Sequence, residues 1–94
     1  MAQAIHAAFG FAHANPDVTT EWLRDSQFLV VVSVPDEQAL MDLTYAADDR
    51  DIITHLWREP DLRDQATAVA LAPVPATMKL CSNLPLAGRE KVPV

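Results

Sequence analysis

The sequence is poor in glycine, cysteine and basic residues, and each shortage excludes a class of protein. Its two glycines, Gly10 and Gly88, exclude both glycine-rich patterns that bind nucleotide phosphates. The single cysteine, Cys81, excludes an internal disulfide framework and a zinc site of paired thiolates, and indicates a reducing compartment. No hydrophobic run approaches the roughly 20 residues of a membrane span, and the start lacks the pattern of a signal peptide. We therefore expect a cytoplasmic protein.

Charge and size set two further expectations. Thirteen acidic residues against seven basic residues give a formal net charge of −6, which opposes non-specific binding of nucleic-acid phosphates. The chain has 94 residues, 50% hydrophobic and 21% charged, which is typical of a globular domain. We expect one domain over residues 1–85 and a tail over 86–94. Because so small a domain buries a modest share of its surface, dimerisation is also expected.

Hydrophobic periodicity predicts the order of the elements. Apolar residues at helical spacing favour a helix over 2–15, a short second helix around Trp22, a third helix that begins at Pro35 and a last helix over 74–84. Strands are predicted over these ranges: 27–34, 52–57 and 66–72. The polar residues between the last two strands form a predicted loop.

This order predicts the fold class. A strand, a crossover helix and a second strand suggest a parallel pair, and the loop over 58–65 permits antiparallel pairing of the last two strands. The expected fold is a small mixed α/β sheet of about three strands with helices on both faces. The open edge of such a sheet could pair with another chain.

The segment 58–64 is the first candidate site, because it places three carboxylates and two guanidinium groups within seven residues. Its charged residues are Arg58, Glu59, Asp61, Arg63 and Asp64. In open α/β sheets, binding and catalytic groups lie at the ends of strands, as these do. The alternative interpretation is a solvated polar turn.

Histidine and cysteine offer weaker candidates. His6 and His13 are seven residues apart, too far along a helix to share a metal ion, and we predict no metal site. His6 could be a packed structural side chain or a functional one, whereas His55 is interpreted as packing. Cys81 is predicted to be an inert, buried thiol.

Three segments in this order resemble the type 2 peptidyl-tRNA hydrolases. Residues 2–8, Ala-Gln-Ala-Ile-His-Ala-Ala, are similar to that family's first-helix motif. Residues 30–37, Val-Val-Val-Ser-Val-Pro-Asp-Glu, resemble its second strand and the Pro-Asp-Glu start of the next helix. Residues 66–75, Ala-Thr-Ala-Val-Ala-Leu-Ala-Pro-Val-Pro, are similar to the segment that precedes its last helix. The order of these segments identifies the chain as a member of that family.

The resemblance implies an activity and a set of residues. Members hydrolyse the ester between a peptide and tRNA, need no metal or organic cofactor, and commonly form dimers. By position, the family's histidine falls on His6, its threonine on Thr67, and its aspartate on Glu59 or Asp61. The candidate substrate-binding residues are Gln3, Arg58 and Arg63. The family's first strand and lysine loop would precede residue 1, so we expect either a shortened member without that lysine or a start further upstream.

Two functions follow from these observations. In the first, Glu59 or Asp61 orients a water molecule while Thr67 and His6 stabilise the oxyanion of peptidyl-tRNA hydrolysis. In the second, the chain keeps the hydrolase-like fold without catalysis and binds a protein partner at its open sheet edge or at the face of its first helix. A homodimer is compatible with both, and no membrane partner is expected.

Overall fold

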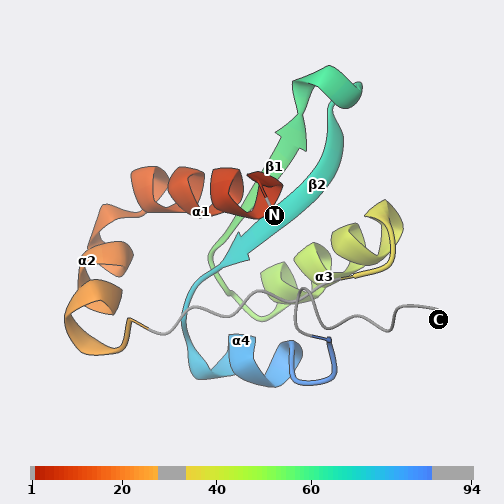
Figure 1. Cartoon of the computed structure of the whole chain (residues 1–94). Coiled ribbons are helices and arrows are strands. Elements are labelled where there is room, and N and C mark those ends of the chain that lie inside the picture. Colours follow the sequence, from red (N-terminus) through yellow and green to blue (C-terminus); the bar gives the residue numbers. More distant parts are fainter. Residues whose placement is uncertain (1, 28–33, 86–94) are drawn as a thin grey trace, which may run out of the picture.

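The computed structural model describes residues 2–27 and 34–85. Within these ranges the chain forms four α-helices, one short 3-10 helix and two strands. Their bounds are α1 (Ala2–Ala14), α2 (Pro16–Asp25), α3 (Glu37–Asp49), β1 (Thr54–Glu59), η1 (Pro60–Leu62), β2 (Gln65–Leu71) and α4 (Pro75–Leu80). Figure 1 shows α1 crossing the β1–β2 hairpin, with η1 at one end of the hairpin and α4 toward the other.

The two strands pair in antiparallel fashion, from Thr54 opposite Leu71 to Glu59 opposite Gln65. A β-bulge interrupts the register next to Trp57, because Ala68 pairs with Trp57 and Ala66 pairs with Arg58. The extra residue on β2 is Thr67. The antiparallel pairing confirms one of the predicted strand pairs. About three strands were predicted, and the described sheet has two; residues 28–33 of the predicted strand 27–34 lie outside the described residues.

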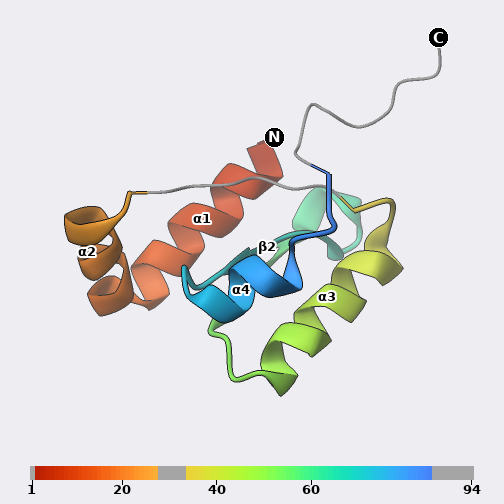
Figure 2. The same cartoon turned by 90° about the horizontal axis from the view of Figure 1, so that it is seen from below.

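Helices cover both faces of the hairpin, which confirms the predicted α/β class. Figure 2 shows the hairpin between α1 and α3, and both helices contact both strands. On the α1 side the two surfaces approach closely at Gly10, since a Cβ atom there would overlap the ring of His55. Glycine in the middle of a helix costs about 1 kcal/mol relative to alanine. At this position it permits the helix to lie against β1.

Several predicted boundaries were wrong for local reasons. The third helix begins at Glu37 and not at Pro35, because Asp36 is its N-cap and accepts a hydrogen bond from the Ala39 amide at 2.8 Å. The last helix, predicted over 74–84, ends at Leu80, because the chain then turns, with the Leu84 amide donating to the Cys81 carbonyl at 3.0 Å. Asn15 separates α1 from α2, and Pro16 lies in the first turn of α2.

The core of the described residues is small and rich in alanine. Phe11 of α1 packs with Ala47, Ile52 and Ala72, and all four are buried. These residues come from α1, from α3 and from the segments that flank the hairpin, so one cluster joins both faces of the sheet. No described helix combines the length and the hydropathy needed to cross a membrane.

One side-chain hydrogen bond joins α3 to β2 across 29 residues of sequence. The Glu37 carboxylate accepts the Ala66 backbone N–H at 2.7 Å, and Ala66 is buried. Ala66 lies beside the β-bulge. A buried backbone N–H without an acceptor costs free energy, so Glu37 stabilises the strand where its ladder is irregular.

We expect Glu37→Ala to lower the free energy of unfolding by about 1–2 kcal/mol, because the Ala66 amide loses a charged acceptor. Glu37→Gln keeps an acceptor oxygen and should cost less. The matched control is Gln38→Ala on the same helix, which removes an exposed bond to Asp42 and should cost a few tenths of a kcal/mol. Urea unfolding followed by circular dichroism measures all three. Equal losses for Glu37→Ala and Gln38→Ala would show that the bond contributes nothing.

Candidate functional site

The candidate site begins with a contact between α1 and β1. The ring of His6, near the start of α1, lies against the ring of Trp57, with their centroids 4.8 Å apart and their planes at 47°. His6 is exposed and Trp57 is half-buried. An aromatic pair at this separation fixes the relative orientation of its two rings. The exposed imidazole therefore has a defined position beside the sheet.

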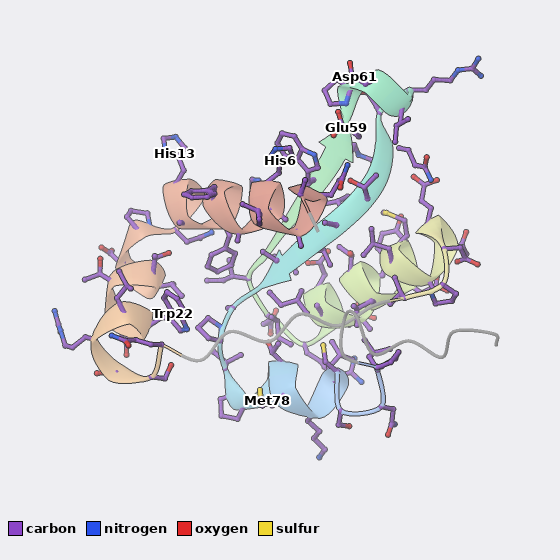
Figure 3. The ribbon with its side chains drawn as sticks, in the orientation of Figure 1. His6, His13, Trp22, Glu59, Asp61 and Met78 are labelled. Carbon is purple, nitrogen blue, oxygen red and sulfur yellow. The ribbon has the colours of Figure 1, made fainter. Side chains whose placement is uncertain are left out.

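Trp57 also contacts the carboxylate that ends its strand. Its indole Nε1 donates to Oε2 of Glu59 at 3.4 Å, and Oε1 of Glu59 accepts the Asp61 backbone N–H at 3.5 Å. Both bonds lie at the long end of the range, so they orient the carboxylate more than they stabilise it. His6, Trp57 and Glu59 thus form a continuous cluster. Figure 3 shows His6 and Glu59 in it, with Asp61 on the turn that follows.

The turn after Glu59 carries the remaining charged residues of the candidate segment. Arg63 and Asp64 adopt left-handed backbone conformations, with φ of 55° and 59°. The Asp64 amide donates to the Glu59 carbonyl at 3.1 Å, and Arg58 Nη1 donates to the Asp64 carbonyl at 3.1 Å. The guanidinium of Arg58 therefore stabilises the turn. Arg63 and Asp61 are both exposed on it.

Arg58 and Glu59 were predicted to lie in a loop, and this prediction was wrong. Both belong to β1, which continues to Glu59 before η1 begins. The Glu59 side chain accepts from Asp61, so it caps η1 from the last position of the strand. A residue held by strand pairing is placed more firmly than a loop residue.

Thr67 is the extra residue at the β-bulge, next to the Ala68–Trp57 pair. Its hydroxyl is buried and has no hydrogen-bond partner among the described residues. A buried, unsatisfied hydroxyl is unfavourable and is often found where a group serves a function. Bulges also occur next to active sites, where they redirect a side chain.

Gln3 lies one turn before His6 on α1, so the two residues share a side of that helix. Gln3 is half-buried. The structure thus gathers His6 and Glu59 around Trp57, with Thr67 on the neighbouring strand, whereas Arg63 and Asp61 lie on the exposed turn.

His13, His55 and Cys81 make none of the contacts that define this cluster. His13 is exposed two turns along α1, and Figure 3 shows it away from Glu59. His55 packs against α1 at Gly10, as predicted. Partial burial raises the pKa of the Cys81 thiol, which makes its reactive thiolate scarcer. In the described part of the chain, no group of three or more histidine, cysteine or acidic side chains could hold a metal ion.

A cavity of about 370 Å³ lies elsewhere, between α2, the residues before β1 and those after β2. Its lining includes Trp22, Asp51 and Ile52, and none of the predicted site residues contributes to it. The His6 cluster is taken as the candidate site because the imidazole and the oriented carboxylate both contact Trp57 there.

The sequence pattern did not single out Trp57 as a site residue. It was expected only to share a strand face with His55. Trp57 also contacts His6 on α1 through its ring and Glu59 on β1 through its N–H. Both contacts depend on the three-dimensional position of the indole. The spacing of Trp57 and Glu59, two apart on one strand and so on one face, was the available signal.

Comparisons with known proteins give one family match for the chain. Among curated proteins, no sequence matches the chain significantly. The sequence model of one family, described as Peptidyl-tRNA hydrolase PTH2, matches residues 1–84. That range contains α1, the hairpin and every residue of the candidate site, and it confirms the resemblance seen in the three sequence segments. The chain belongs to the peptidyl-tRNA hydrolase PTH2 family.

Proposed function

We propose that this chain hydrolyses the ester that joins a peptide to the 3′ end of tRNA. The observation that supports this proposal most is the oriented Glu59 carboxylate, linked through Trp57 to His6. Family membership supplies the substrate class. The cluster supplies a proton acceptor and neighbouring polar groups, which are what ester hydrolysis by water requires.

In the proposed reaction, Glu59 accepts a proton from a water molecule as the water oxygen bonds to the ester carbonyl carbon. The carbonyl oxygen becomes an oxyanion, which accepts hydrogen bonds from His6 and from the Thr67 hydroxyl once the bound substrate reaches that buried group. The bond to the ribose oxygen then breaks, and the ribose oxygen takes the proton back from Glu59. The products are a peptide with a free carboxyl group and a tRNA with a free terminal hydroxyl. Atoms and charge balance without a cofactor.

Glu59 is a better candidate for the base than Asp61. Glu59 is half-buried at the end of a paired strand and accepts two hydrogen bonds, whereas Asp61 is exposed on the turn. Catalysis depends on a group held at a fixed distance from the reacting atoms. The exposed Asp61 carboxylate has no such constraint from the contacts described above.

The alternative function is a non-catalytic module that binds a protein partner, as a homodimer or at a sheet edge. It uses the same fold and makes a different prediction for the purified chain, namely no turnover of any ester substrate. Loss of turnover on substitution of Glu59 supports the hydrolase and contradicts this alternative. We also propose a cytoplasmic location, since peptidyl-tRNA is an intermediate of translation.

We expect Glu59→Gln to lower kcat for an N-acetylated aminoacyl-tRNA by at least about 100-fold, because the amide cannot accept the water proton. Glutamine keeps the shape and the acceptor for Trp57. The matched variant Asp61→Asn should retain activity within about threefold, since its carboxylate is exposed. Release of free tRNA from the purified chain measures both. A large loss in Asp61→Asn with none in Glu59→Gln would move the base to Asp61.

Thr67→Val separates stability from activity. The Thr67 hydroxyl has no partner in the described residues, so its replacement by a methyl group should leave the unfolding temperature unchanged or slightly higher. Loss of one oxyanion donor lowers kcat by about 100-fold or more in other hydrolases, and we expect a fall of that order. Thr67→Ser keeps the hydroxyl and should remain active. Unchanged kcat in Thr67→Val would remove the hydroxyl from the mechanism.

A further inference from the structure

The outer side of α1 carries an apolar stripe that the folded chain leaves uncovered. Phe9 is 73% exposed and Ile5 is 50% exposed, four residues apart. The buried residues of the helix, Ala7 and Phe11, lie on the other side. Residues three and four apart share a face of a helix, so Ile5, His6 and His13 all lie beside Phe9. Phe9 is the centre of this stripe.

The stripe is continuous with the candidate site. His6 belongs to both, since its ring contacts Trp57 while its position on α1 is next to Phe9. Phe9 follows His6 by three positions on the helix, which is a rise of about 4.5 Å along the axis. Figure 3 shows His6 and His13 on the same side of α1, with His6 toward the hairpin. A molecule held at His6 therefore extends over Phe9 when it follows the helix toward α2.

The charge of the chain favours a particular kind of contact here. The formal net charge is −6, so attraction of phosphates cannot supply most of the affinity for a polyanion. The helix α1 contains no aspartate or glutamate, whereas α2 contains Asp17, Glu21 and Asp25. A nucleic acid is therefore repelled less by α1 than by the neighbouring α2. Stacking of a base on an aromatic ring does not depend on phosphate contacts.

From these observations we propose that Phe9 is the stacking surface for the terminal nucleobase of the tRNA. This inference rests on the proposed function, because it assumes that the ester lies at the Glu59 cluster. The terminal base is joined to the same ribose that carries the ester. When that ester lies beside His6, the base is within one nucleotide's length of it, and Phe9 is the large exposed ring one turn away.

The chain contains a matched control for this proposal. Tyr45 on α3 is an exposed aromatic residue, 57% accessible, and α3 lies on the opposite side of the hairpin. Removal of either ring deletes a similar exposed side chain from a helix. The substitution Tyr45→Ala should leave binding at the His6 face unchanged.

The test uses two fluorescent probes, each a short nucleic acid whose terminal ribose carries an N-acetylamino acid through an amide. The first probe ends in Cyt-Cyt-Ade. The amide is resistant to hydrolysis, so binding is measured without turnover. In the second probe the terminal base is absent and the ribose remains. Fluorescence anisotropy gives the dissociation constant of each probe for the wild-type chain, for Phe9→Ala, for Phe9→Trp and for Tyr45→Ala.

We expect the wild-type chain to bind the complete probe about tenfold more tightly than the probe without the base. Stacking of one base on one aromatic side chain gives an affinity gain of this order in proteins that bind single-stranded nucleic acid. Phe9→Ala should bind the two probes equally. Phe9→Trp and Tyr45→Ala should keep the difference. The ratio between probes should change little between 50 and 200 mM salt, because both probes carry the same phosphates.

Each other outcome overturns the inference in a recognisable way. A difference between probes that persists in Phe9→Ala places the base elsewhere. Equal weakening of both probes by Phe9→Ala indicates a contact with the peptide part. If Phe9→Ala changes a dimer to a monomer in sedimentation and the ratio is unaffected, the stripe is a face for a second copy. Ester turnover by the wild-type chain with no effect of the base defeats this inference alone, whereas base-dependent binding without turnover defeats the proposed activity alone.

Discussion

The close approach of α1 to β1 is the constraint on which the other features depend. Because Gly10 has no side chain, the helix lies against the ring of His55, and this sets the height of α1 above the hairpin. At that height Phe11 reaches the buried cluster with Ala47, Ile52 and Ala72, and the ring of His6 reaches Trp57. The outward position of Phe9 follows from the same rotation of the helix. One glycine thus relates the core, the candidate site and the exposed stripe.

The fold class and the candidate residues were predictable from the sequence to different extents. Pro75 marked the start of the last helix correctly, since a proline in the first turn has no lost hydrogen bond. Pro16 was expected only to end the first helix, and the structure also places it in the first turn of α2. The helix predicted to begin at Pro35 begins at Glu37, because the adjacent Asp36 occupies the N-cap position and the helix starts at the next residue. The family was recognisable from ordered short segments that no single period describes.

The arrangement of the site was less predictable, because its contacts depend on register. Sequence order placed Glu59 and Asp61 as equivalent candidates two residues apart. The strand continues through Glu59 and ends before Asp61, which gives one carboxylate a fixed position and leaves the other on the turn. The bulge at Thr67 is likewise a property of pairing between strands, and nothing in the local run of alanine and valine indicates which residue is extra. The bond from Glu37 to Ala66 crosses 29 residues and lay beyond any local pattern.

The indole of Trp57 joins a helix to a carboxylate through two faces of one rigid ring system. Its ring surface contacts His6, and its N–H donates to Glu59. The same rigid indole therefore sets the position of the His6 ring on α1 and the direction of the Glu59 carboxylate on β1, so the helix and the carboxylate share one reference point.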